Sequence, residues 1–384
     1  MKKTLVALAA LAATGAFAQS SVTIFGAVDA SFNSATADLA GPNGTSHSES
    51  KQSLASSQLG SSKLGFTGSE DLGGGLRANF KLEGGLYNDI GAGKATSTNN
   101  QPGGSTGVGG LTFQRRSYVG LSGGWGEIKL GREYVNTFLG VQAATDPFGT
   151  NGPADSTQMM LLVGSVAGKA GGAEVNASNM ITYITPDMSG FSANLQYFMG
   201  ENTSGASNSD DGNGYSITGQ YAKGPLFVSL GELGIKYNQL TSANVATGLG
   251  DFKLDSFSIS YNFGMAKLGY TWAHEGVTAM ANTGADWKND SNLIGVTVPY
   301  GAFNFKGSYI WATNNFNAAK NDTKGELFGL GVDYALSKRS VLYATYGNIK
   351  NHDGGNLYGT GVVAGTLAAD ASTSNLAIGM YHAF

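Results

Sequence analysis

Several segments of this chain alternate large apolar side chains with small polar ones. Residues 256–263 read Ser-Phe-Ser-Ile-Ser-Tyr-Asn-Phe, and similar alternation recurs at 79–83, 191–197 and 328–334. A period of two is typical of a β-strand with one apolar and one polar face. In a membrane such strands must close into a barrel, because lipid and water favour opposite faces and an open edge would leave backbone groups unpaired in hydrocarbon.

The amino-terminal segment has the features of a secretory signal peptide. Residues 1–3 are Met-Lys-Lys, residues 4–13 are mostly apolar, and Ala-Phe-Ala at 16–18 is a cleavage site of the small-x-small type. Cleavage after Ala18 would leave residues 19–384, and the loss of two lysines would change the net charge from −4 to −6. Because no later apolar run approaches the ~20 residues of a membrane helix, an exported membrane protein would have to cross with strands.

Composition supports a membrane barrel and excludes several other classes. Charged residues make up only 13 % of the chain, below the usual ~25 %, as expected where one face of each strand meets lipid. Cysteine is absent, which excludes disulfides and thiolate metal sites. The mild acidity argues against a nucleic-acid partner, which would favour a basic surface.

Turn signals divide the mature chain into alternating short and long connections, an arrangement typical of outer-membrane barrels. Tight turns are predicted at 71–75, 123–126, 186–190, 223–225, 263–265, 300–302 and 337–339. Long loops are predicted near 37–60, 90–110, 135–178, 201–214, 239–252, 278–290, 314–324 and 352–374. We therefore predict an all-β fold, a single antiparallel barrel of sixteen strands over residues 19–384, with fourteen or eighteen strands as alternatives. A lumen of this width is too large for side chains to fill, so it implies a water-filled passage.

The carboxy-terminal strand ends on an aromatic residue. Phe384 closes a segment in which Leu376, Ile378 and Met380 alternate with smaller or polar side chains. This ending is the usual targeting signature of outer-membrane barrels, and we interpret Phe384 as an assembly signal.

Four segments together resemble one protein family. They are the mature start at 19–26, the segment 62–76, Arg-Arg-Ser at 115–117 and Trp-Gly-Glu-Ile-Lys-Leu-Gly-Arg at 125–132. They resemble the trimeric general porins of betaproteobacteria, the neisserial-type branch of the Gram-negative porins. The resemblance implies a homotrimer in the outer membrane, with lipids and the barrel assembly machinery as partners, that lets ions and small hydrophilic solutes diffuse through.

In that family the third long loop folds into the barrel and narrows it. Here it would be the stretch from 135 to about 178, and its bend would be Pro147-Phe148-Gly149. This stretch is also the longest predicted connection, and long loops without regular structure are usually functional. We therefore expect an inward-folded constriction loop.

Strand alternation predicts a positively charged wall in the pore. In a channel the lumen-facing side chains set the size of the constriction and the field across it. Five basic residues have strand neighbours that are apolar and point outward, so their own side chains are predicted to point into the lumen. They are Lys63, Arg77, Lys81, Arg116 and Lys129. The same alternation turns Glu83 inward. Arg115 precedes Arg116 by one residue, so alternation turns its side chain to the opposite face of the strand. We therefore interpret Arg115 as a structural or interface residue.

Acidic residues are predicted on the opposite side of the constriction. They are Glu133 at the base of the loop, with Asp146 and Asp155 within it. Many relatives carry Arg in the next strand, within Asn-Ser-x-Arg-Tyr, whereas this chain has Thr182. The basic wall favours anions and the net charge of −6 favours cations; distant loop charges are screened within a Debye length of about 10 Å. We therefore predict a weak anion preference.

Other functions remain as alternatives. A substrate-specific channel for sugars or carboxylates would show saturable binding, and a barrel enzyme or adhesin would need a catalytic set or a passenger domain. The Gly-x-Ser-x-Gly match at 120–124 precedes a tight turn instead of opening a helix, and the histidines lack metal-ligand spacing. We expect no catalytic residues, no metal and no cofactor.

Overall fold

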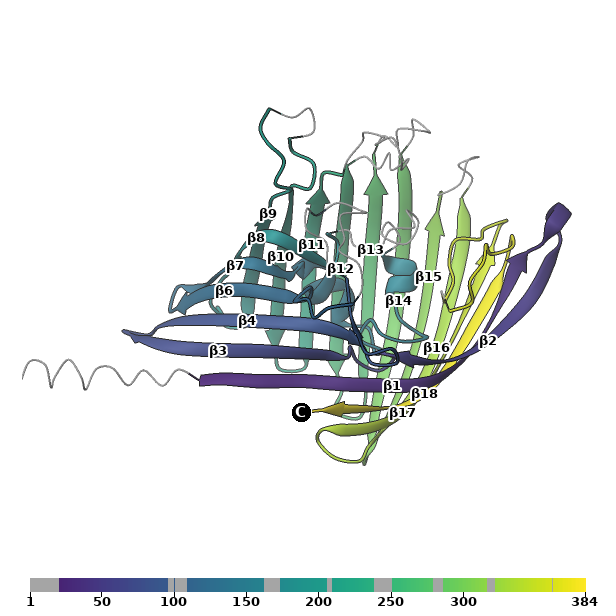
Figure 1. Cartoon of the computed structure of the whole chain (residues 1–384), viewed down its shortest axis with the longest axis horizontal. Coiled ribbons are helices and arrows are strands. Elements are labelled where there is room, and N and C mark those ends of the chain that lie inside the picture. Colours follow the sequence, from purple (N-terminus) through teal and green to yellow (C-terminus); the bar gives the residue numbers. More distant parts are fainter. Residues whose placement is uncertain are drawn as a thin grey trace, which may run out of the picture.

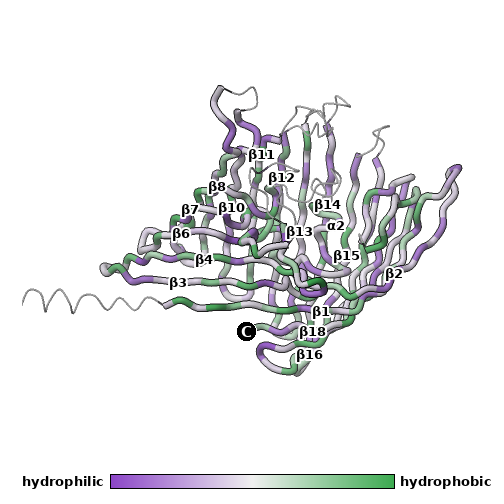
Figure 2. The backbone as a smooth tube through the Cα atoms, viewed as in Figure 1, coloured by the Kyte–Doolittle hydropathy of each residue, from purple (hydrophilic) through white to green (hydrophobic). Residues whose placement is uncertain are grey.

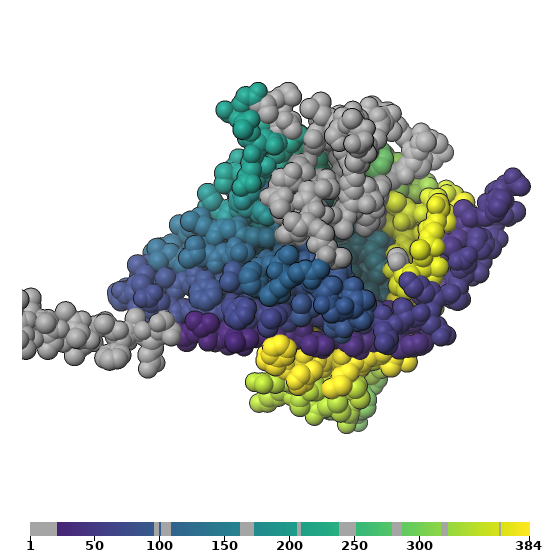
Figure 3. Space-filling model, in the orientation of Figure 1, coloured from purple at the N-terminus to yellow at the C-terminus, as the bar shows by residue number. Residues whose placement is uncertain are grey.

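The chain forms one antiparallel sheet that closes on itself. The computed structural model describes residues 21–95, 100, 109–161, 173–205, 209–237, 251–278, 286–315, 322–360 and 362–384. The last strand, β18 (Ser372–Ala383), pairs with the first, β1 (Ser21–Ala40). Figure 3 shows this seam, where yellow atoms of the carboxy-terminal segment border purple atoms of β1. The predicted signal peptide at 1–18 lies outside the described residues.

The barrel wall contains sixteen strands, as predicted. Its second strand is interrupted, because β2 (Ser46–Ser56) and β3 (Lys63–Gly73) both pair with β1. The two-residue β5 (Ala92–Gly93) pairs with the end of β4 in a separate small sheet. The remaining wall strands are β4 (Leu76–Tyr87), β6 (Arg116–Gly123), β7 (Gly126–Tyr134), β8 (Asn176–Ile184), β9 (Phe191–Phe198), β10 (Gly214–Lys223), β11 (Leu226–Ile235), β12 (Phe252–Asn262), β13 (Lys267–Val277), β14 (Trp287–Tyr300), β15 (Phe303–Asn314), β16 (Thr323–Ala335) and β17 (Ser340–His352). Figure 1 shows them surrounding a central space, with the near strands strongly tilted against the far ones.

The seven predicted tight turns are confirmed, since each lies between two strands that pair with one another. The predicted loop at 37–60 is wrong. β1 continues to Ala40 and β2 starts at Ser46, and a 3-10 turn at Pro42–Gly44 joins them. From Ser46 to Ser53, β2 has no apolar side chain on either face, because a strand that extends beyond the membrane needs no apolar face. Alternation in the sequence therefore could not reveal this strand.

The outward face is apolar, and the inward face combines small polar side chains with a buried apolar cluster that includes Leu233, Leu254 and Leu293. On β11 and β12, Leu230 and Ile259 are exposed, whereas Ser229, Ser256 and Ser258 are buried. Figure 2 shows green stretches next to pale and purple ones along the strands of the wall. Among the described residues, no helix is long and apolar enough to cross a membrane. The fold thus presents an apolar outer surface, and its inner face is polar except where the buried apolar cluster packs.

A charge on the outer face should destabilise the barrel. Leu230 lies in the middle of β11, and 59 % of its surface is exposed. We expect Leu230→Lys to lower the free energy of unfolding by ~2–4 kcal/mol, the usual cost of a lysine at the bilayer midplane. Guanidinium titration in lipid vesicles measures this, with Leu230→Phe as the control that keeps the face apolar. Equal stability of the two variants would contradict the assignment of this face to lipid.

Candidate functional site

The connection between β7 and β8 folds into the barrel, as predicted. It starts with a short π-helix, Thr137–Val141, whose Thr137 amide and hydroxyl bond the inward-facing Ser216 on β10. The carbonyl of Val141 accepts a hydrogen bond from Ser258 on β12. The loop then continues along the inner face of the wall to Thr145, whose hydroxyl bonds Thr271 on β13. The first part of the loop is therefore hydrogen-bonded to the inner face of three wall strands, β10, β12 and β13.

The predicted bend lies against the next part of the wall. The ring of Pro147 packs on Gly295 of β14, and the ring of Phe148 packs on Gly329 and Gly331 of β16. Gly149 has φ +61°, a left-handed conformation that a residue with a side chain rarely adopts. The bend therefore seats an aromatic anchor on β16.

Inward-facing glycines allow this close approach. The wall glycines whose added Cβ atom would meet the loop are Gly231, Gly269, Gly295, Gly329, Gly331 and Gly347. The tightest contact is at Gly347 on β17, where a Cβ would lie 1.9 Å from the carbonyl oxygen of Pro153. Such a distance excludes any side chain without movement of the loop. Part of the high glycine content, 59 residues, thus serves to seat the loop.

A cluster of basic side chains occupies the wall that the described part of this loop does not line. It comes from β3, β4, β6 and β7, with one member just before β6. Its members are Lys63, Lys81, Arg115, Arg116 and Lys129, which we call the basic cluster. Alternation turns these strand positions inward because their neighbours Val119, Leu121 and Leu130 face outward. Following the order of strands around the ring, β4–β7 lie across from β13–β15.

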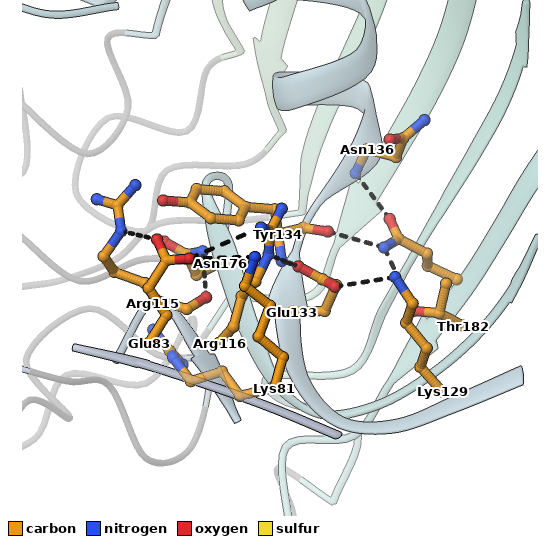
Figure 4. Close-up of polar contacts among 12 residues, drawn as sticks. Lys81, Glu83, Arg115, Arg116, Lys129, Glu133, Tyr134, Asn136, Asn176 and Thr182 are labelled. Atoms are coloured by element: carbon orange, nitrogen blue, oxygen red, sulfur yellow. Dashed lines mark hydrogen bonds and ion pairs between the residues drawn. The ribbon is translucent and has the colours of Figure 1, made fainter. Parts of the chain in front are cut away.

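Two carboxylates hold the basic cluster together, as Figure 4 shows. Glu83 is only 2 % exposed and lies 2.6 Å from Arg115 Nε, 3.5 Å from Lys81 Nζ and 3.8 Å from both Arg116 and Lys63. Glu133 lies 2.6 Å from Arg116 Nε and 3.3 Å from Lys129 Nζ. A buried carboxylate is stable only when it is paired in this way. With Glu127, 3.7 Å from Lys129, three carboxylates face five cations and leave an excess of two positive charges.

Sequence reasoning missed the role of Arg115. Parity assigned it to the opposite face from Arg116, but β6 begins only at Arg116, so alternation does not apply one residue earlier. The guanidinium carbons of Arg115 and Arg116 lie 5.4 and 4.9 Å from the ring centre of Tyr134, so both arginines contact one aromatic ring. Arg115 is therefore a member of the basic cluster.

Two predicted residues lie elsewhere than expected. Glu133 lies inside the basic cluster and not across from it, because β7 carries it on the same strand as Lys129. Arg77 is exposed near the tight turn that precedes β4, and the structure does not place it with the basic cluster. The predicted arrangement of a basic wall facing Glu133 is thus replaced by a mixed cluster with a positive excess.

The loop acids stabilise the loop itself. Asp146 accepts hydrogen bonds from the amides of Phe148, Thr150 and Ser156 at 2.8–3.2 Å, which closes the bend. Asp155 accepts bonds from the amide and the hydroxyl of Thr157. Burial raises the pKa of the Asp155 carboxyl to about 7, and the neighbouring Asp146 carboxylate adds to this. At neutral pH the loop therefore carries less negative charge than its sequence suggests.

Thr182 lies beneath the base of the loop. It is buried on β8 and is paired with Lys129 across the sheet, while Gln196 donates a bond to its hydroxyl at 3.4 Å. Gln196 also donates to the carbonyl of Tyr134 and accepts from the amide of Asn136. A small neutral side chain at 182 thus leaves room for the glutamine that fixes the start of the loop.

The last residue completes the seam of the barrel. The amide of Phe384 donates to the carbonyl of Gly26 at 3.0 Å, and the amide of Gly26 donates back to Phe384 at 3.1 Å. Its ring packs so closely on Gly26 that an added Cβ there would lie 2.4 Å from it. An assembly role for Phe384 stays a prediction.

Comparisons with known proteins identify the family. The family of Gram-negative porins matches residues 4–354. This chain belongs to that family. It is 35 % identical to outer membrane porin protein 32 of Delftia acidovorans over the full length of both chains. It is 27 % identical to major outer membrane protein P.IB of Neisseria meningitidis, over 93 % of this chain and 96 % of the relative.

A solved structure agrees with the fold of this porin. An anion-selective porin from Comamonas acidovorans superposes with a TM-score of 0.75 and 30 % identity, covering 95 % of this chain and 100 % of the other. The predicted resemblance to betaproteobacterial porins is therefore confirmed. The protein is an outer-membrane porin, a passive channel through which solutes pass, and not an enzyme.

A side chain at Gly347 should displace the constriction loop of this porin. We expect Gly347→Ala to move the Pro153 carbonyl away from β17 and to change the single-channel conductance, because the loop tip defines the open cross-section. Gly276→Ala is the matched control, since a Cβ there would have its nearest neighbour at 3.9 Å. Planar-bilayer recording compares the two variants. Unchanged conductance in a folded Gly347→Ala barrel would contradict this contact.

Proposed function

We propose that this porin is a general diffusion channel with a weak preference for small anions. The observation that carries the proposal is the positive excess of the basic cluster, five cations against three carboxylates. The cluster lies on the part of the wall that the described residues of the constriction loop do not line. Water in a narrow passage bounded by protein screens charge less than bulk water, so this excess raises the local concentration of anions.

The arrangement suits transit better than tight binding. Glu83 and Glu133 already engage the guanidinium and ammonium groups, so a passing carboxylate or phosphate finds donors whose charge is partly compensated. Several cations on adjacent strands offer successive weak contacts along the wall. Conduction requires sites that attract an ion and also release it. The preference should be weak because Thr182 contributes no charge.

A substrate-specific channel for sugars or carboxylates is the second candidate. The basic cluster would suit a carboxylate, and saturable current block by one particular solute would favour this reading. The general channel is preferred because most charges in the cluster are paired with each other.

We further propose export with removal of residues 1–18, insertion by the barrel assembly machinery with Phe384 as signal, and a homotrimer in the lipid bilayer. The resemblance to trimeric porins supports the trimer. Outward apolar side chains on the first strands, Ile24 and Leu54, are 61 % and 70 % exposed and could contact a neighbouring barrel as well as lipid.

Ion preference should depend on the basic cluster. In a potassium chloride gradient we expect a reversal potential whose sign shows that chloride passes more readily than potassium. Arg116→Gln should shift this potential toward the value of a channel that prefers potassium. Arg77→Gln is the matched control, because it removes the same charge from an exposed position outside the cluster. Glu83→Gln should shift the potential the opposite way. Clear cation preference of the wild-type channel, or equal shifts from Arg77 and Arg116, would overturn the proposal.

Gel electrophoresis and bilayer recording should detect the proposed trimer. We expect a heat-resistant band of three times the monomer mass on an unboiled gel, and conductance steps in groups of three. Leu54→Lys should lower the temperature at which the band dissociates, because it places a charge on the outward face. Monomers in every mild detergent would contradict the trimer.

A further inference from the structure

The interruption between β2 and β3 carries four more residues than the wall requires. Ser56 pairs with Ala30 of β1, and Lys63 pairs with Ala27. Six residues therefore lie between the two partners, whereas only two lie between Ala27 and Ala30. A bulge of this size removes chain from the ladder and bends it. We call residues 57–62 the inward bulge.

The carboxylate of Asp29 holds the bulge on the lumen side. Asp29 is fully buried on the inward face of β1, and its Oδ2 accepts the amides of Leu59 at 2.6 Å and Gly60 at 2.8 Å. Its Oδ1 accepts the hydroxyl of Tyr343 on β17 at 2.5 Å. Bonds to a charged acceptor are roughly twice as strong as neutral ones, so this carboxylate is well suited to fix irregular backbone.

The wall stays sealed at the interruption. The amide of Asp29 donates to the hydroxyl of Ser62 at 2.9 Å, and that hydroxyl lies 3.2 Å from the carbonyl of Asp29. The amide of Ser57 also donates to this carbonyl. Because the ladder groups of Asp29 retain partners, the bulge leaves no unpaired backbone at this residue. It is therefore a built feature of the wall and not a local opening.

The bulge reaches the tip of the constriction loop. Ser61 Oγ lies 3.2 Å from Asn151 Oδ1, and a Cβ at Gly152 would lie 2.2 Å from the carbonyl oxygen of Gln58. On its other side the tip presses Pro153 against Gly347 of β17. The bulge also borders a cavity of about 310 Å³ together with inward side chains of β15, β16 and β18. The loop tip is thus held between the bulge and the wall.

We propose that the inward bulge is a second constriction element and that Asp29 is the positioning residue that sets it against the loop tip. The pore is then narrowed by two segments that support each other, and its width depends on Asp29 although this residue is not part of the basic cluster. This inference rests on the inward fold of the loop and is independent of the proposed ion preference, because it concerns conductance and not the reversal potential.

Deletion of residues 58–61 tests the role of the bulge. The deletion removes the four excess residues, so β2 and β3 can continue as one regular strand beside β1. We expect a folded barrel, shown by heat-modifiable gel migration, whose single-channel conductance rises by roughly a factor of two, since conductance follows the open cross-section. A folded deletion variant with parental conductance would overturn the proposal.

Substitutions at Asp29 test its positioning role in the full-length chain. Asp29→Ala should raise the conductance and lower the voltage at which the channel closes, whereas Asp29→Asn, which keeps an acceptor oxygen, should restore most of the parental behaviour. Asp38→Ala is the matched control, because this carboxylate lies on the same strand and accepts the amide of Ser372. Asp29→Ala and Asp29→Asn could instead shift the reversal potential equally and leave the conductance unchanged. Asp29 would then act only as a charge in the pore, and the proposal would fail.

Discussion

Backbone hydrogen bonding in a medium without water is the constraint on which the rest of this structure depends. Every strand that crosses hydrocarbon must have partners on both sides, and only a closed ring provides them. Closure here rests on β18 pairing with β1 and on the reciprocal bonds between Phe384 and Gly26. Because hydrogen bonding fixes the wall in this way, the width and charge of the pore are set by the loop and the side chains that lie inside the ring.

The interior is built by bringing backbone close to backbone. The loop lies on inward glycines and hydroxyl groups, and its own acids close its bends, so few of its charges are left for the pore. The basic cluster lies on the part of the wall that the described residues of the loop do not line. Shape and field thus come from different parts of the chain: the loop and the inward bulge set the width, and the strands β3–β7 set the charge.

Alternation was sufficient to predict the fold and the inward direction of Lys63, Lys81, Arg116 and Lys129, because a period of two specifies a face without knowledge of the neighbours. It failed where the strand had not yet begun, at Arg115, and where β2 is polar on both faces, at 46–53. Alternation also could not show that Glu133 pairs with Arg116, since this contact depends on the register between β6 and β7. Glycines at 329 and 331 were a usable signal, because inward glycines mark places where another segment approaches.

The bulge at 57–62 was hidden for a related reason. Its sequence, Ser-Gln-Leu-Gly-Ser-Ser, is typical of any polar surface loop, and the prediction placed it in one. What makes it an interior element is a single buried carboxylate on the neighbouring strand, and an aspartate within a strand gives no indication of which amides it will accept. A closed wall tolerates such an insertion only when its freed backbone groups find partners, and Ser62 supplies them. The width of the pore therefore depends on a hydrogen-bonded defect in the wall as well as on the loop.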